Sequence, residues 1–127
     1  MPFQTVRDRY VNDGAGVVSQ NRLLIMLFDR LVLDVQQAQE AMGINKLDVA
    51  SDCLCHAQAI LLELHYALDK TAWDGAAQLD DLYLWMHNEL MAANVRKDVK
   101  SIGRCLRMLR DLQEAWTAAY KQVSGDA

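Results

Sequence analysis

One stretch of this chain constrains its fold more than any other. Between positions 47 and 68, apolar residues recur at alternating steps of three and four without a break. This spacing places them along one side of an α-helix, which completes a turn every 3.6 residues. They are Leu47, Ala50, Leu54, Ala57, Leu61, Leu64 and Leu68. Such a stripe is typical of a helix that packs within a bundle.

Three other segments carry the same spacing. The first is expected to begin at its N-cap, Ser19, and to end at Gly43. Its apolar positions are Leu24, Leu27, Leu31, Val35, Ala38 and Met42. After a connection over residues 69–75, the next segment is expected to end at Asn94 and to present Leu79, Leu82, Met86, Leu90 and Ala93. The last turns inward Val99, Ile102, Leu106, Leu109, Trp116 and Tyr120.

These segments predict an all-α fold, an antiparallel up-down four-helix bundle over residues 19–123, preceded by a flexible N-terminal arm over residues 1–18. The chain has 127 residues, enough for one domain. A hydrophobic fraction of 52%, drawn mainly from Leu, Ala and Met, with one Pro and six Gly, favours helix over sheet.

Net charge and cysteine content limit the kinds of partner and the cellular compartment that we expect for the protein. A net charge of −4 gives no overall attraction to nucleic acid or to an anionic membrane surface. Three cysteines, Cys53, Cys55 and Cys105, cannot all pair within one chain and fit reduced thiols. The first residues contain no apolar signal core, and the longest apolar run, residues 23–28, is too short to span a bilayer. We therefore expect a cytoplasmic (cytosolic) protein without membrane insertion.

Residues that could carry catalysis are few. The chain has no Gly-rich phosphate loop, no His-Glu-x-x-His zinc pair and no Glu-x-x-His set of the di-iron bundles, so we expect neither an enzyme nor a cofactor. Cys53-x-Cys55-His56 clusters soft ligands, but residues two apart on a helix point in nearly opposite directions. His56 is also compatible with a histidine phosphotransfer domain, another four-helix bundle, although the residues after it, Ala57-Gln58-Ala59-Ile60, lack the Lys-Gly pair that such domains usually place there. A histidine at the boundary of the core is the simpler interpretation, and His65 and His87 carry no chemical argument.

Two surface features remain. A basic row follows a helical step on the last segment, formed by Arg96, Lys100, Arg104 and Arg107. It is either a solvated face or a docking site for an acidic partner. Apolar residues also exceed what one packing face needs, because residues 23–28 point in every direction around the first helix. The surplus fits equally an amphipathic partner segment in a groove between helices and a broad core that the N-terminal arm helps to cover.

Residues 79–98 follow the order Leu-x-x-Leu-Tyr-x-x-Met and then Leu-x-x-Ala-Asn-x-x-x-Asp. Eight residues form this pattern: Leu79, Leu82, Tyr83, Met86, Leu90, Ala93, Asn94 and Asp98. In this order the segment resembles the flagellar secretion chaperone FliS family, which carries a closely similar pattern. The resemblance extends in order over Tyr10, Ser19, Leu23, Met26-Leu27-Phe28-Asp29, Leu68-Asp69, Leu109-Arg110 and Trp116. The chain departs from the pattern at Gln20, where Pro is usual, at Arg30, where Gly is usual, and at Trp73-Asp74-Gly75, where a Gly-rich run is common.

The resemblance implies a cytoplasmic export chaperone. Such a protein binds the C-terminal region of flagellin, prevents premature polymerisation and aids delivery to the flagellar type III export apparatus, a component of which is a further expected partner. Surplus apolar character selects Ile25, Phe28, Leu84, Trp85 and Met91 as client contacts, and the resemblance adds Tyr10, whose arm is expected to cover part of the client surface. The competing interpretation is a homodimer or another homo-oligomerising interaction module without an export role.

Overall fold

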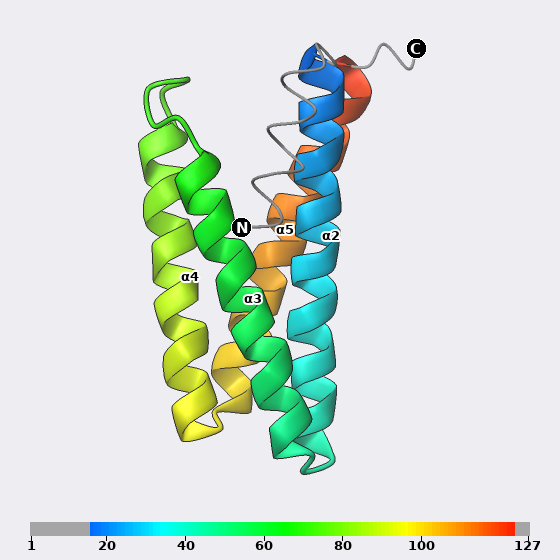
Figure 1. Cartoon of the computed structure of the whole chain (residues 1–127), viewed down its shortest axis with the longest axis vertical. Coiled ribbons are helices and arrows are strands. Elements are labelled where there is room, and N and C mark those ends of the chain that lie inside the picture. Colours follow the sequence, from blue (N-terminus) through cyan, green and yellow to red (C-terminus); the bar gives the residue numbers. More distant parts are fainter. Residues whose placement is uncertain (1–15, 124–127) are drawn as a thin grey trace.

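The computed structural model describes the backbone of residues 16–123 and the side chains of residues 22–119 and 121. This part of the chain forms four α-helices, namely α2 (Gly16–Gly43), α3 (Leu47–Ala67), α4 (Ala76–Arg96) and α5 (Val99–Val123). Successive helices run in opposite directions, so the start of α2, the α3–α4 connection and the end of α5 lie at one end of the bundle (Figure 1). Each helix packs on two neighbours, in the order α2–α3–α4–α5 and back to α2. The predicted all-α, up-down bundle is confirmed.

Two predicted helix ends are wrong. Helix α2 begins at Gly16, so Ser19 lies within the helix and is not its N-cap. Residues 16–18, which were predicted to belong to the N-terminal arm, are therefore helical. The rest of that arm, including Tyr10, lies outside the described residues. Helix α4 continues past Asn94 to Arg96 and ends where Lys97 adopts a left-handed conformation (φ 56°, ψ 46°). The Asn94 amide instead donates to Ser51 Oγ of α3 at 3.2 Å. The residue is therefore used between helices and does not stop one.

The two tight turns at the other end have local causes. Asn45 lies between α2 and α3 with φ at 61°, a region that Asn enters more readily than most residues. Before α5, the Asp98 carboxylate accepts from the backbone N–H groups of Lys100 at 3.1 Å and Ser101 at 3.3 Å. It thus satisfies donors that the first turn of a helix leaves unpaired. These hydrogen bonds, first that from Ser101, lower the pKa of Asp98.

The core follows the predicted stripes with a few exceptions. Most of their central positions are buried and Leu82 is partly buried, whereas Leu47 and Val99, at helix starts, are 36% and 40% exposed. Tyr83 and Cys105 are buried although the stripes did not include them. The side chain of Tyr120 lies outside the described part of the structure. Within the described ranges, no helix combines the length and apolar character needed to span a membrane.

Candidate functional site: an apolar pocket at the loop end of the bundle

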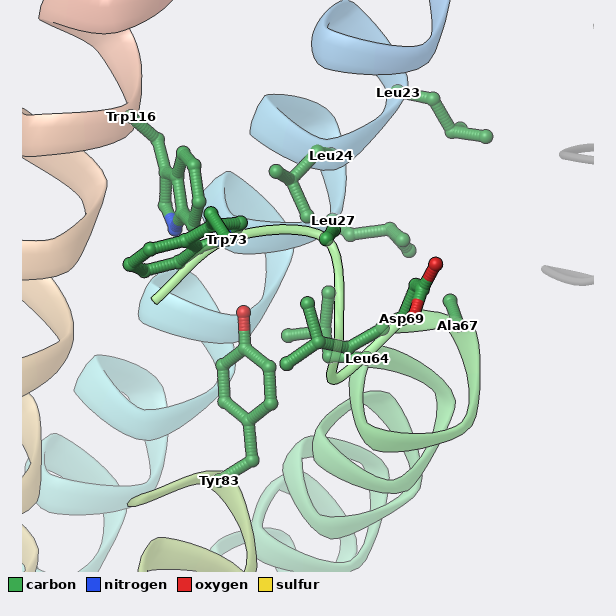
Figure 2. Close-up of a pocket in the computed structure, with 11 residues that line it drawn as sticks. Leu23, Leu24, Leu27, Leu64, Ala67, Asp69, Trp73, Tyr83 and Trp116 are labelled. Carbon is green, nitrogen blue, oxygen red and sulfur yellow. The ribbon is translucent and has the colours of Figure 1, made fainter. Parts of the chain in front are cut away.

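A pocket of about 370 Å³ opens where the α3–α4 connection meets α2 and α5. We call it the loop-end pocket. Figure 2 shows side chains of all four helices and of the connection around it, among them Leu23, Leu24, Leu27, Leu64, Trp73 and Trp116. A second hollow of about 420 Å³ lies next to it and is lined by Trp73, Leu79, Leu112, Ala115, Trp116 and Ala119. Because Trp73 and Trp116 line both hollows, the two indole rings form a shared wall.

The position of Trp73 depends on Gly75. A Cβ atom at position 75 would lie 2.1 Å from Cζ3 of the Trp73 ring, so the ring occupies space that only glycine leaves free. Trp73 remains 50% exposed. The indole is therefore a wall with one side open to solvent.

Hydrogen bonds and ion pairs fix the connection that carries Trp73. The Asp69 carboxylate accepts from the backbone N–H of Thr71 at 2.9 Å and from its hydroxyl at 2.7 Å, which lowers the pKa of Asp69. Behind the connection, the buried Asp80 carboxylate lies 2.6 Å from His65 Nδ1 and 3.1 Å from Lys70 Nζ. Burial alone would raise the pKa of Asp80, but the hydrogen bonds and charges of these two partners outweigh it and lower the pKa.

The His65–Asp80 pair corrects the sequence interpretation, which gave His65 no chemical role. It joins α3 to α4 across 15 positions of the chain. His56 makes a similar contact through Nδ1 with Asp34 of α2, a carboxylate that also pairs with Arg30 at 3.2 Å. With 42% of its side chain exposed, His56 is a boundary residue, as predicted.

Tyr83 lines the floor of the loop-end pocket, and Phe28 packs beneath it without lining it. The ring of Phe28 lies 6.2 Å from that of Tyr83 and 6.3 Å from that of Trp116, measured between centroids. Phe28 is fully buried and Tyr83 is 2% exposed. Burial, with a smaller effect of the Asp80 charge, raises the pKa of Tyr83 well above its usual value. The phenol therefore keeps its proton at neutral pH.

The predicted client contacts do not gather at this pocket. None of those that the structure describes lines either hollow. Phe28 was assigned to surplus surface, and that assignment is wrong because its side chain is buried between α2, α4 and α5. Trp85 and Met91 are 45% and 46% exposed. Ile25 and Leu84 are partly buried, and Tyr10 lies outside the described residues.

Sequence reasoning missed Trp73 and Tyr83 as pocket residues. Trp73 was visible only as a tryptophan in a connection, directly before Asp74-Gly75. An aromatic residue in a turn between two helices is a usable signal, because a large apolar side chain is expected to pack against the protein and not to face solvent. Trp116 was predicted to point inward, and it does, but its contribution to a pocket depends on helices that the pattern cannot place.

The other candidate features are dispersed. The basic row is exposed along α5 and the end of α4, and Arg104 lies 2.8 Å from Ser101 Oγ and 3.7 Å from the Glu89 carboxylate. Cys55 is exposed and Cys105 is buried. Among residues 16–123, no group of three or more His, Cys, Asp or Glu side chains is placed to hold a metal ion.

Comparison with known proteins identifies the family. The family model described as flagellar protein FliS matches residues 3–123. Three relatives each bear the name flagellar secretion chaperone FliS. The Escherichia coli K12 protein is 31% identical over 108 residues, 84% of this chain and 79% of its own. The Vibrio cholerae serotype O1 protein is 25% identical over 90% of this chain and 85% of its own, and the Bacillus subtilis 168 protein is 21% identical over 99% and 94%. With a four-helix bundle and a family match over nearly its whole length, the chain belongs to the FliS family.

Proposed function

We propose that this protein is a cytoplasmic export chaperone that binds the C-terminal region of flagellin. In this role it prevents premature polymerisation and aids delivery to the flagellar type III export apparatus. Family membership supports the chaperone role, and the loop-end pocket is the observation that carries the binding mode. The role needs binding surface and no reacting group.

The apolar surface suits a client that is disordered before it binds. Such a segment loses conformational entropy when it becomes ordered, and it offsets this loss by burying apolar side chains over a long contact. The loop-end pocket and its neighbour provide apolar hollows at one end of the bundle. Exposed Trp85 and Met91 extend apolar surface along α4. We propose these features, with Ile25, Leu84 and the Tyr10 arm, as client contacts, while Phe28 supports the pocket from beneath.

Isothermal titration with the C-terminal region of flagellin from the same genome tests this proposal. We expect one-to-one binding with a negative heat-capacity change, the mark of apolar burial. Absence of binding at high micromolar concentration would contradict the proposed function.

A pair of alanine variants locates the binding surface. Ala72 is exposed and lines the pocket, so Ala72→Arg should obstruct it without removing a core contact. Ala77 is exposed on α4 and lines neither hollow, which makes Ala77→Arg the matched control. We expect Ala72→Arg to weaken client binding about tenfold or more, and Ala77→Arg to change it less than about twofold. Equal affinities for the two variants would place the client elsewhere on the bundle.

A homo-oligomerising module is the second candidate, favoured by exposed apolar side chains on the first and third helices of the bundle. Met26 and Leu33 on α2 are 58% and 40% exposed, and Trp85 and Met91 on α4 are similarly open. A second copy of the chain would bury such side chains. Light scattering separates the candidates, because a stable dimer that does not bind flagellin supports the module and a monomer that binds it supports the chaperone.

A further inference from the structure

One polar atom in the loop-end pocket is not explained by the folded chain. Trp116 Nε1 is buried and has no hydrogen-bond acceptor among the residues that the structure describes. Among the described side chains, the other buried polar atom in this situation is Asp80 Oδ2, and the Lys70 ammonium lies 3.1 Å from it as an ion-pair partner. A buried donor without an acceptor costs free energy, and proteins satisfy nearly all such groups. The Trp116 indole N–H is therefore a candidate for an acceptor that arrives with a ligand.

A second donor belongs to the same pocket. The Tyr83 hydroxyl extends from the floor toward the Trp73 and Trp116 side of the pocket (Figure 2). Tyr83 is 2% exposed, and its hydroxyl makes no hydrogen bond within the described part of the chain, although it is not one of the fully buried polar atoms there. The hydroxyl is therefore accessible from the pocket, where it can donate a hydrogen bond. The pocket thus holds two polar groups that the described structure leaves without one.

The charges around the pocket select the kind of acceptor. Among the described residues that line it there is no cation, and the one ionisable carboxyl group of this lining, Asp69, is negative at neutral pH. Lys70, on the same connection, is paired with Asp80. A carboxylate or phosphate would lose its hydration there and face a like charge without a compensating cation. A neutral acceptor held among apolar side chains fits this environment.

We propose that the loop-end pocket binds an apolar segment of the flagellin C-terminal region through a main-chain carbonyl group that accepts hydrogen bonds from Trp116 Nε1 and the Tyr83 hydroxyl. The inference rests on the proposed function and adds the chemistry of recognition to it. A carbonyl left unpaired within the segment, as at the last turn of a helix, meets the requirement. The aliphatic walls from α2 and α3 accept the side chains beside it. The client carbonyl then accepts the hydrogen bonds that the two donors of the pocket lack within the described chain.

Nuclear magnetic resonance of the full-length protein tests the Trp116 contact directly. The chain has three tryptophans and so gives three indole N–H signals, and Trp116→Phe assigns the one of interest. On addition of the flagellin C-terminal region, this signal should move downfield and its exchange with solvent should slow. A signal already at a hydrogen-bonded position in the free protein, and unmoved by the client, would assign the acceptor to the chain itself and overturn the proposal.

Affinity measurements test both donors. Trp116→Phe and Tyr83→Phe each remove a hydrogen-bonding group and keep an aromatic ring, so each should weaken client binding about threefold to tenfold. Tyr66 is 71% exposed and lines neither hollow, so Tyr66→Phe is the control and should leave affinity unchanged. Urea unfolding of each variant checks that the bundle is intact. If the wild-type protein binds flagellin and both pocket variants bind within twofold of it, this inference is wrong while the proposed function stands. If the wild-type protein does not bind, the proposed function itself fails.

Discussion

The Asp80 carboxylate allows the sharpest test of how the pocket end of the bundle is held together. Asp80→Asn keeps the shape of the side chain and removes its charge. Asp80 pairs with His65 and Lys70, and the loss of stability depends on how exposed each side chain is. The exposed fractions are 2% for Asp80, 19% for His65 and 56% for Lys70. The mostly buried hydrogen bond to His65 contributes about 1.5–3 kcal/mol. The solvent-exposed Lys70 pair contributes at most about 1 kcal/mol.

The neutral side chain is also easier to bury, which offsets part of this loss. We therefore expect Asp80→Asn to reduce the free energy of unfolding by about 2 kcal/mol at pH 7. The pH dependence follows from the lowered pKa of Asp80 in the folded state. A carboxyl group with a depressed folded-state pKa stabilises the protein fully above its unfolded value, about 3.9, and this contribution is lost as the pH falls through the folded value. The difference between the two proteins should thus be fully present at pH 6 and shrink as the pH falls below about 3.9.

Urea unfolding followed by circular dichroism at several pH values measures both effects. Asp81→Asn is the matched control, because Asp81 is exposed and makes no hydrogen bond or ion pair within the described residues. It should change stability by less than about 0.5 kcal/mol. A loss below that figure for Asp80→Asn at pH 7, or a difference of the same size at pH 3 and pH 7, would refute the reasoning.

Two further predictions concern the pocket wall and the thiols. Gly75→Ala should displace the Trp73 ring, which we expect to appear as a changed tryptophan emission spectrum and a loss of stability of about 1–3 kcal/mol. Gly43→Ala places its added Cβ with no atom within 4 Å, so it should leave the emission spectrum unchanged and should not reduce stability. Equal behaviour of the two variants would contradict the packing argument. Burial raises the pKa of Cys105 to about 11. This thiol should therefore react with a disulfide reagent at pH 8 far more slowly than exposed Cys55. Similar rates would show that Cys105 is accessible.

Periodicity in the sequence predicted the number, order and approximate length of the helices in the described part of the chain. Local signals also located two ends closely, since α2 ends at Gly43 as predicted and the connection before α4 begins at Leu68, one residue earlier than predicted. These features depend on neighbours within one or two helical turns. The sequence alone therefore contains the information needed to infer them.

Phe28 shows where that information ends. A single apolar stripe predicts one packing face, but each helix of this bundle contacts two neighbours, so its buried arc is wider than the stripe. Phe28 falls within the wider arc and becomes core, although it was expected at the surface. Which residues outside a stripe become buried depends on where the adjacent helices lie.

The site was decided by the tertiary structure. His65 contacts Asp80, and Trp73 lines the same pocket as Trp116, 43 positions further along the chain, because the connection and all four helices converge at one end of the bundle. The sequence determined that amphipathic helices would form and that apolar surface would be in excess. The packing of the helices alone decided where the excess apolar surface forms a pocket. Contacts between residues far apart in the chain depend on where the helices lie relative to one another, and not on the spacing of residues within any one helix.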